Sequence, residues 1–316
     1  MDYTTLGRTG LKVGVAGLGC GGNAKVGLGR GKSEAEAVAL IRRALDLGVN
    51  FLDTARGYGT EKVVGAAIGS VPRYEVIVSS KYHAGGVTAD RLAAEIDASL
   101  RDLDTDYIDV FHLHGVHPDQ YDHSLAVLVP VLERARAAGK IRFLGITETA
   151  PNDHAQVMLQ RAVGDDCWDV IMLGFNMMHQ VARSAVLPAT MKNNIGTLIM
   201  FAVRNLFSVP GRLQETMREL AAAGQVPDEL ADTDDPLGFL VHPEDGGAAS
   251  VIEAAYRYAR QEPGADVVLF GTGSIDHLEE NIASILKPPL PAADTARLAG
   301  LFGHLQGVGL DLPGGG

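Results

Sequence analysis

The stretch that decides the fold is "EVIVSSKYHAGGVTADRLAAEIDASLRDLDTDYIDVFHLH", residues 75–114. It begins with a short apolar run, Glu75 to Lys81, and ends with another, Tyr107 to His114. Between the two runs, Thr88 opens an amphipathic segment with the spacing of an α-helix. Two strands that are joined by a helix lie parallel in one sheet, with their carboxyl ends at the same edge. This stretch therefore predicts one βαβ unit.

The same alternation repeats along the whole chain, because short apolar runs bounded by turn residues alternate with segments of helical period. The predicted strands are Val13–Gly19, Val49–Asp53, Glu75–Lys81, Tyr107–His114, Ile141–Thr147, Trp168–Phe175, Ile195–Phe201 and Asp266–Gly271. Eight strands that are each followed by a helix predict an α/β fold, the closed (β/α)8 TIM barrel.

The segments that flank the barrel units have turn signals of their own. The first residues, "YTTLGRTGLKV", place turn residues between two β-prone runs and predict an N-terminal β-hairpin that caps one end of the barrel. Residues 204–247, after the seventh strand, are rich in turn formers and predict a long loop that covers the site. We expect residues 1–316 to form a single domain, with a flexible tail over about residues 305–316.

The composition favours a globular protein that acts on small molecules. The chain is 46% hydrophobic and 21% charged, and its net charge of -12 argues against nucleic acid or an anionic membrane as partner, since both attract basic surfaces. Two cysteines, Cys20 and Cys167, cannot build a disulfide framework. With no basic segment before an apolar run at the N-terminus, and no apolar stretch of about 18 residues, we expect a cytoplasmic protein.

In a barrel of this kind the carboxyl ends of the strands hold the functional residues. Asp53 and Tyr58 belong to the second unit, Lys81 ends the third strand, and either His112 or His114 belongs to the end of the fourth. A phenol has a pKa near 10, and a nearby ammonium such as Lys81 stabilises its ionised form. Asp53 could keep Lys81 charged, and an imidazole could donate to a carbonyl oxygen. These residue types together make a proton-transfer set.

The residues around these positions resemble the aldo-keto reductase family. The resemblance rests on "GVNFLDTARGYGTE", "VIVSSK" and "SLRDLDTDYIDVFHLH", and extends from the N-terminal hairpin through "GKIRFLGIT" to "HLEENIASI". It implies a catalytic tetrad of Asp53, Tyr58, Lys81 and His114, with His112 as a packing or hydrogen-bonding neighbour. Tyr58 would act as general acid or base while nicotinamide exchanges hydride with the carbonyl or alcohol carbon of an aldehyde, ketone or sugar.

The resemblance also implies an extended NAD(P)(H) across the barrel mouth. Besides Asp53, the expected cofactor-binding residues are Gly21, Gly22, Thr147 and Glu148 near the nicotinamide, Phe201 stacked on it, Ala202 and Arg204 at the pyrophosphate, and Gly271, Thr272, Gly273, His277, Glu280 and Asn281 at the adenosine end. Met172 stands where the family often has a glutamine that binds the carboxamide. The adenosine end offers His277 but no Lys or Arg for a 2′-phosphate, so we expect weak discrimination between the cofactors or an NAD preference.

Three other interpretations fit parts of the sequence. "GLGCGG", residues 17–22, matches a dinucleotide-binding fingerprint, but the glycine-rich residues after it cannot form the helix that this motif needs. His112, His114 and His117 could belong to a metal-dependent barrel hydrolase, although the later strand ends offer no further ligands. A regulatory subunit that binds the cofactor with little turnover would carry the same tetrad. Neither the substrate nor the oligomeric state can be read from the sequence.

Overall fold

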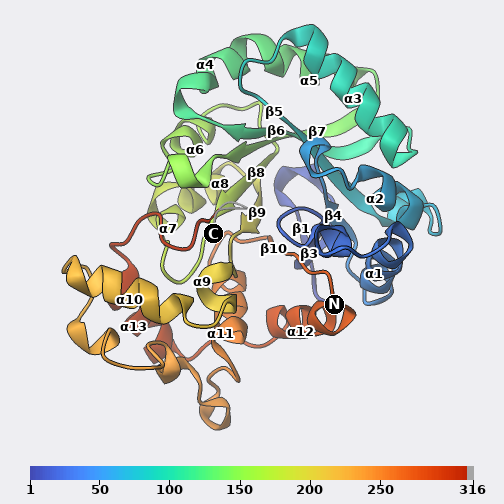
Figure 1. Cartoon of the computed structure of the whole chain (residues 1–316). Helices are drawn as coiled ribbons and strands as arrows, with labels where there is room; N and C mark the ends of the chain where they lie inside the picture. The colour runs from blue at the N-terminus through green and yellow to red at the C-terminus, as the bar shows by residue number, and fades with distance from the viewer. Residues whose placement is uncertain (312–316) are drawn as a thin grey trace.

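The computed structural model describes residues 1–311, in which eight parallel strands close into a barrel in the order β10-β3-β4-β5-β6-β7-β8-β9. The strands are β3 (Ala16–Gly19), β4 (Phe51–Asp53), β5 (Ile77–His83), β6 (Ile108–Val116), β7 (Ile141–Glu148), β8 (Val170–Gly174), β9 (Gly196–Met200) and β10 (Val267–Phe270). Helices surround this barrel on its outer side (Figure 1). The predicted (β/α)8 fold is confirmed.

The first predicted strand, Val13–Gly19, is in fact two elements. Its beginning lies in β2 (Lys12–Gly14), which pairs antiparallel with β1 (Tyr3–Thr5) to form the expected N-terminal hairpin. Val15 joins this hairpin to the barrel, since its amide donates to Asp2 and its carbonyl accepts from Val268 of β10. The hairpin closes one barrel end because three of its apolar side chains join the cluster inside the barrel: Leu6, Leu11 and Val13.

Helices connect the strands and cover the barrel. They are α1 (Glu34–Asp46), α2 (Glu61–Ile68), α3 (Ala89–Leu103), α4 (Tyr121–His123), α5 (Val129–Ala137), α6 (Val157–Ala162), α7 (Ala182–Ala185), α8 (Leu187–Lys192), α9 (Asn205–Ser208), α10 (Arg212–Ala222), α11 (Val251–Arg260), α12 (Ile275–Ile285) and α13 (Ala292–Phe302). Thr88 caps α3 as predicted, because its hydroxyl accepts from the Arg91 amide. Within residues 1–311, none of these helices combines the length and the apolar character that crossing a membrane requires.

Strand alternation places polar side chains at the carboxyl end of the barrel interior. Phe51, Ile77 and Val110 point into the interior cluster from β4, β5 and β6. Because every second residue of a strand faces the same side, Asp53 on β4 and Lys81 on β5 also point inward, nearer the carboxyl ends of their strands. His112 and His114 follow Val110 on β6 in the same way. On each of these three strands, the inward-facing side chains therefore change from apolar to ionisable toward the carboxyl end.

The connection that follows β9 is long, as predicted, but it folds into α9 and α10. The helix α10 buries an apolar face made of Leu213, Met217 and Leu220. Packing of this face stabilises a helix where a loop was expected. Phe201, Val203 and Arg204 of this connection line the cavity at the barrel mouth that is described below, and coverage of the site by the rest of the connection stays a prediction.

The predicted flexible tail lies partly outside the residues that the structure describes, since residues 312–316 are not among them. Of the described residues in this segment, Leu305 and Leu310 are buried. The Gly307 amide donates to His179 Nδ1 over 3.1 Å, and the Asn176 amide group donates to the Val308 carbonyl over 3.2 Å. The segment up to Asp311 therefore packs on the residues that follow β8.

Candidate active site

Lys81 and Asp53 form a buried ion pair at the carboxyl ends of neighbouring strands. Lys81 Nζ donates to the two Asp53 oxygens over 2.8 and 2.7 Å, and to the Thr54 carbonyl over 2.7 Å. The Ser79 hydroxyl donates to the same carboxylate over 2.8 Å. Burial is the largest single influence and lowers the pKa of Lys81, but the charges and hydrogen bonds of Asp53 and Tyr58 together outweigh it, so that the pKa lies above its ordinary value. The Lys81 side chain is therefore an ammonium at neutral pH.

Tyr58 lies over this ammonium. It ends the short 3-10 turn Arg56–Tyr58 that follows β4, and Lys81 Nζ is 4.8 Å from the centroid of its ring. The ring packs on Gly21, where a Cβ atom would lie 2.5 Å from Tyr58 Cε2. Burial raises the pKa of Tyr58, and the nearby Lys81 lowers it by less. The effect of Lys81 expected from the sequence is present but outweighed, so the phenol is protonated at neutral pH.

His114, not His112, faces Tyr58. His114 Nε2 lies 3.4 Å from the Tyr58 hydroxyl, and the two rings meet edge to face at 86°. Burial and the charge of Lys81 lower the pKa of His114 to about 3, which leaves a neutral imidazole. His112 is buried inside the barrel against Gly145, and neither of its ring nitrogens has a hydrogen-bond partner within residues 1–311. His112 thus takes the packing position expected for it.

A cavity of ≈ 320 Å³ opens beside these residues at the carboxyl end of the barrel. Its wall includes Tyr58, His114 and Asp53, whereas Lys81 is fully buried behind them. The expected cofactor-binding residues that line it are Gly21, Gly22, Asp53, Thr147, Glu148, Phe201, Arg204 and Gly271. With Met172 of β8, the structure therefore brings together, in one concave site, residues from seven strand ends that are far apart in the sequence.

The other expected cofactor residues lie outside this cavity. Ala202 is buried, and the Thr272 hydroxyl accepts from the Ser274 amide over 3.0 Å just before α12. His277 and Glu280 are exposed on α12, and Asn281 is half-buried there. A ligand that contacts both the cavity residues and the expected residues on α12 must extend from the cavity past Gly271.

Two features of the site were not predicted from the sequence. Phe201 has a φ of 66°, a left-handed conformation that is rare for a residue other than glycine, and it turns the chain directly after β9. Arg30 lies close to the expected adenosine end: a Cβ atom on Gly273 would be 3.8 Å from Arg30 Cδ and 3.0 Å from Gly27 Cα. In the sequence, the glycine-rich stretch around Gly27 could have indicated that two loops approach each other closely here.

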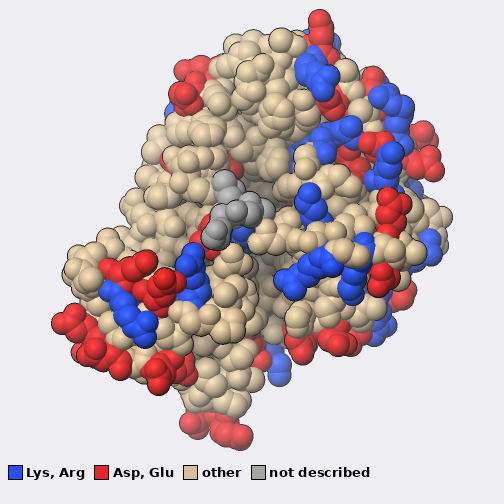
Figure 2. Space-filling model, in the orientation of Figure 1, with Lys and Arg blue, Asp and Glu red and all other residues tan. Residues whose placement is uncertain are grey.

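Basic and acidic side chains are distributed unevenly around the barrel mouth. Figure 2 shows Lys and Arg interspersed with Asp and Glu over the half of this face that holds α1, α2 and α3, and again around α10, whereas the surface between them is mostly uncharged. Arg204 lies in the cavity wall, where its guanidinium donates to the Asp311 carbonyl and lies 5.0 Å from the Phe201 ring centroid.

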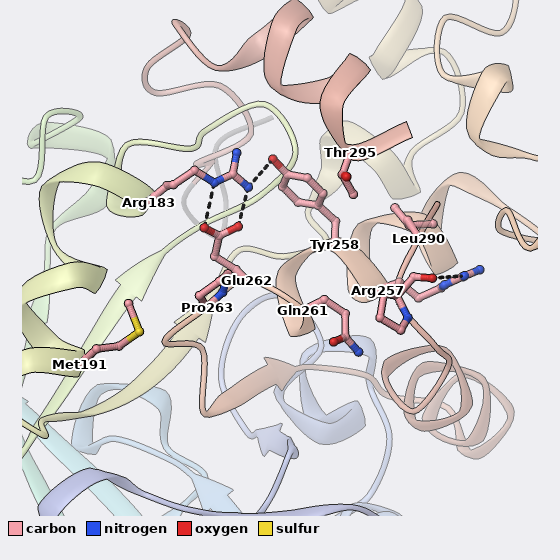
Figure 3. Close-up of a pocket in the computed structure, with 10 residues that line it drawn as sticks. Arg183, Met191, Arg257, Tyr258, Gln261, Glu262, Pro263, Leu290 and Thr295 are labelled. Atoms are coloured by element: carbon pink, nitrogen blue, oxygen red, sulfur yellow. Dashed lines mark hydrogen bonds and ion pairs between the residues drawn. The ribbon is translucent and has the colours of Figure 1, made fainter. Parts of the chain in front are cut away.

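A larger hollow of ≈ 430 Å³ lies elsewhere, between α8 and the end of α11. Its charged groups already have partners: Arg183 pairs with Glu262 and donates to the Tyr258 hydroxyl over 2.9 Å (Figure 3). Arg257 donates to backbone carbonyls such as that of Pro288 over 2.8 Å. These residues join α11 to its neighbours, and the hollow lacks the ionisable groups of the barrel mouth.

A smaller hollow of ≈ 240 Å³ is also lined by His114. It is lined by Arg56, Gly57, Tyr82, His83, Arg91, Glu95 and His114. The guanidinium of Arg56 is held by Glu61, Glu95 and Asp102. Its wall is therefore polar, and His114 lines both this hollow and the cavity at the barrel mouth. Among residues 1–311, no group of three or more His, Cys, Asp or Glu side chains is placed to hold a metal ion.

Comparison with known proteins identifies the family. The model of the aldo/keto reductase family matches residues 17–301, which is most of the chain. The chain belongs to the aldo/keto reductase family. The resemblance seen in the sequence is thereby confirmed, and this aldo/keto reductase belongs to a family of oxidoreductases.

Relatives of this aldo/keto reductase carry the names of reductases and dehydrogenases. Aldo-keto reductase YhdN of Bacillus subtilis is 30% identical over 313 residues, covering 88% of this chain and 87% of that one. D-threo-aldose 1-dehydrogenase of a Pseudomonas species is 31% identical over 248 residues, covering 67% and 72%. L-galactose dehydrogenase of Arabidopsis thaliana is 37% identical over 157 residues, covering 46% of this chain and 48% of that enzyme, so the match spans about half of each.

Solved structures show the same fold as this aldo/keto reductase. The holo form of an aldo-keto reductase from Bacillus halodurans superposes with a TM-score of 0.72 at 21% identity, covering 98% of this chain and 100% of that one. An aldo/keto reductase from Klebsiella pneumoniae in complex with NADP and acetate gives a TM-score of 0.69 at 23% identity, covering 96% of each chain.

Proposed function

We propose that this protein is an NAD(P)(H)-dependent oxidoreductase that acts on the carbonyl or alcohol carbon of a sugar or related aldehyde, with Tyr58 as general acid and base. The observation that carries the proposal is the position of the Tyr58 hydroxyl, 3.4 Å from the neutral His114 and beside the Lys81 ammonium, in the wall of a cavity. When bound, the nicotinamide supplies or accepts the hydride. The protein's own groups manage the proton.

In the direction of reduction, protonated Tyr58 gives its proton to the carbonyl oxygen. The phenolate that remains is stabilised by Lys81, which Asp53 and the Thr54 carbonyl hold in place. In oxidation the phenolate takes the proton back from the alcohol. His114 is neutral, so it orients the reacting oxygen by a hydrogen bond and adds no charge.

The residues of the cavity fit a nicotinamide and the adjoining phosphates. Phe201 offers a ring face for stacking, and the glycines Gly21, Gly22 and Gly271 leave room for close approach to the backbone. Arg204 is the cation of this wall; its contact with the Asp311 carbonyl must yield to a phosphate. We propose that NADP and NAD are discriminated weakly. Binding of NADPH at least about tenfold tighter than NADH would contradict this part of the proposal.

For the substrate, we propose a hydroxylated aldehyde or the cyclic form of an aldose. Two observations support this choice. The hollow beyond His114 is lined by groups that can donate or accept hydrogen bonds, such as Tyr82 and His83. In addition, relatives bear the names D-threo-aldose 1-dehydrogenase and 6-dehydroglucose reductase, the latter 35% identical over 136 residues.

The test is a panel of aldoses, aromatic aldehydes and ketones, each followed in both directions by the nicotinamide absorbance with NAD and with NADP. The proposal expects turnover with at least one aldose and a lower kcat/KM for apolar aromatic aldehydes. If no compound on the panel turns over while both dinucleotides bind, the chain is a cofactor-binding protein instead, and the proposed activity is wrong.

A further inference from the structure

Arg56 begins the turn that holds Tyr58, and its side chain is bound by three acids. Its Nε donates to Glu95 over 3.0 Å, and one Nη1 donates to both Glu61 and Asp102. Glu61 begins α2, whereas Glu95 and Asp102 lie on α3. Two of the three nitrogens of the guanidinium are therefore engaged. This guanidinium network of Arg56 and its three acids ties the turn Arg56–Tyr58 to two helices.

Glu61 continues the network to the strand that carries Lys81. Its side chain is buried, with Oε2 bound to Arg56 and Oε1 accepting from the Ser80 hydroxyl over 2.6 Å. Ser80 directly precedes Lys81 on β5. Because successive residues of a strand face opposite sides, Ser80 points out of the barrel where Lys81 points in. Arg56, Glu61 and Ser80 thus connect the turn of the phenol to the strand of the ammonium.

The backbone of the turn does little to fix Tyr58. A glycine stands on either side of it, Gly57 and Gly59, and Gly59 has a φ of 72°. Glycine restricts the backbone less than any other residue. The hydroxyls of Thr54 and Thr60, both buried, form a hydrogen bond of 2.8 Å that closes the base of this segment. That bond fixes the two ends, whereas the guanidinium network fixes the turn between them.

The position of this turn decides whether Tyr58 can act on a substrate. The Tyr58 hydroxyl lies 3.4 Å from His114 Nε2, and Lys81 Nζ lies 4.8 Å from the centroid of the phenol ring. A hydrogen bond of this length is lost when the groups move apart by a few tenths of an ångström. Misplacement of a reacting group by about 1 Å can cost up to roughly a hundredfold in rate.

We propose that Arg56 is a positioning residue: through the guanidinium network, it holds the Tyr58 hydroxyl in place relative to Lys81 and His114. This inference rests on the proposed function. Arg56 also lines the small hollow that His114 lines. Its guanidinium is nevertheless engaged by three acids, so that Arg56 acts through Tyr58 and does not bind the substrate.

The experiment measures single-turnover hydride transfer from NADH in the full-length protein, over a range of substrate concentrations. The substrate probe is D-glyceraldehyde, a small hydroxylated aldehyde, or the compound of the panel above that wild type reduces fastest. In Arg56→Met we expect the rate at saturating substrate to fall at least about tenfold. The substrate concentration that gives half of this rate, and the dissociation constant of NADH, should stay within about threefold of wild type.

Arg73→Met is the matched control. The Arg73 side chain is 20% exposed, against 24% for Arg56, and it likewise pairs with a buried acid, Asp109, over 2.7 Å. It lies in the turn before β5, at the amino end of that strand, whereas the cavity opens at the carboxyl end. Both variants should lower the free energy of unfolding in urea. Only Arg56→Met should slow hydride transfer, and Arg73→Met should stay within about twofold of wild type.

A double variant keeps the test decisive if Arg56→Met does not fold. Arg56→Met leaves Glu61 buried without its cation, and Glu61→Gln removes that uncompensated charge. The double variant Arg56→Met/Glu61→Gln still lacks the link between the turn and β5. It should therefore lose at least about tenfold in rate as well, with the affinity for NADH kept within about threefold.

Two results would overturn the inference. One is a rate of hydride transfer in Arg56→Met or in the double variant that equals the rate of Arg73→Met. The other is an unchanged saturating rate that needs at least about tenfold more substrate, which would make Arg56 a substrate-binding residue. Both leave the proposed function intact, because wild type is active in them. A wild-type protein that binds NADH but transfers hydride to no compound of the panel refutes the proposed function itself.

Discussion

Lys81 Nζ lies 2.8 and 2.7 Å from the two carboxylate oxygens of Asp53, and both side chains are buried. Removing an ammonium from water costs several kcal/mol unless an anion compensates for the loss. Asp53 provides that compensation, so a charged Lys81 can remain beneath Tyr58. The ion pair therefore links the stability of the barrel mouth to the proton chemistry proposed for Tyr58.

Removing one partner of this pair should destabilise the protein. Asp53→Asn leaves Lys81 buried without its anion, and we expect the free energy of unfolding to fall by about 3–5 kcal/mol. Urea denaturation measures this change. Glu133→Gln, which breaks the exposed pair between Glu133 and Arg136, is the matched control and should cost less than about 1 kcal/mol. An equal loss of unfolding free energy in the two variants would show that the buried Asp53–Lys81 pair contributes no more to stability than an exposed ion pair.

The close contact between Gly21 and Tyr58 makes a second prediction. In Gly21→Ala, the new Cβ atom would meet the Tyr58 ring at 2.5 Å and push the phenol from its place. Misplacement of a general acid by about 1 Å can cost up to roughly a hundredfold, so we expect kcat to fall at least about tenfold. Gly57→Ala is the control, because a Cβ atom there meets no other group within 4 Å. A Gly21→Ala enzyme with full kcat would contradict this packing.

Buried neutral histidines should make the fold sensitive to acid. Burial lowers the pKa of His112 well below its ordinary value, of His114 to about 3 and of His179 to about 4. Because the unfolded chain takes up these protons near pH 6.5 and the folded chain does not, their contribution is complete above that pH and is lost as the pH falls.

Each of these histidines can contribute a slope of up to about 1.4 kcal/mol per pH unit. The measurement is the free energy of unfolding in urea between about pH 7 and pH 5. We expect a shallower slope in His112→Gln and an unchanged slope in His277→Gln, since His277 is exposed on α12. A slope that does not differ between these variants would exclude His112 as a source of acid sensitivity.

We expect Arg30 to strengthen the binding of NADPH through a contact with its 2′-phosphate. Its side chain lies beside Gly273, at the expected adenosine end, and a guanidinium suits a 2′-phosphate. We expect Arg30→Ala to weaken NADPH binding roughly tenfold, in line with the loss of a hydrogen bond to a charged group, and to leave NADH within about twofold. Arg218→Ala on α10 removes an equal charge from the surface as control. Equal losses for both dinucleotides in Arg30→Ala would contradict a 2′-phosphate contact.

The sequence predicted the barrel because the alternation of apolar runs and helical segments is a local signal. It did not predict the division of the first strand into β2 and β3, since the run from Val13 to Gly19 is apolar or glycine throughout and hides the change of partner at Val15. The helix α10 was missed because turn formers on either side of it dominate the segment. Its helical spacing of Leu213, Met217 and Leu220 was nevertheless available.

The candidate site could be predicted where chemistry and position along a strand coincide. Asp53, Lys81 and His114 stand at strand ends, so the barrel brings them together. Burial raises the pKa of Glu148 to about 8, and this shift could not be predicted, because only coordinates show how deeply the side chain is buried. The same holds for Arg30, whose approach to Gly273 joins loops about 240 residues apart.

The most direct measurement is single-turnover hydride transfer in Tyr58→Phe, with cofactor affinity measured on the same samples. If Tyr58 is the proton donor, the rate should fall by about two to four orders of magnitude, while the dissociation constant for the dinucleotide stays within about twofold of wild type. A Tyr58→Phe enzyme that binds the cofactor normally and transfers hydride at nearly the wild-type rate would contradict the central role assigned to this hydroxyl.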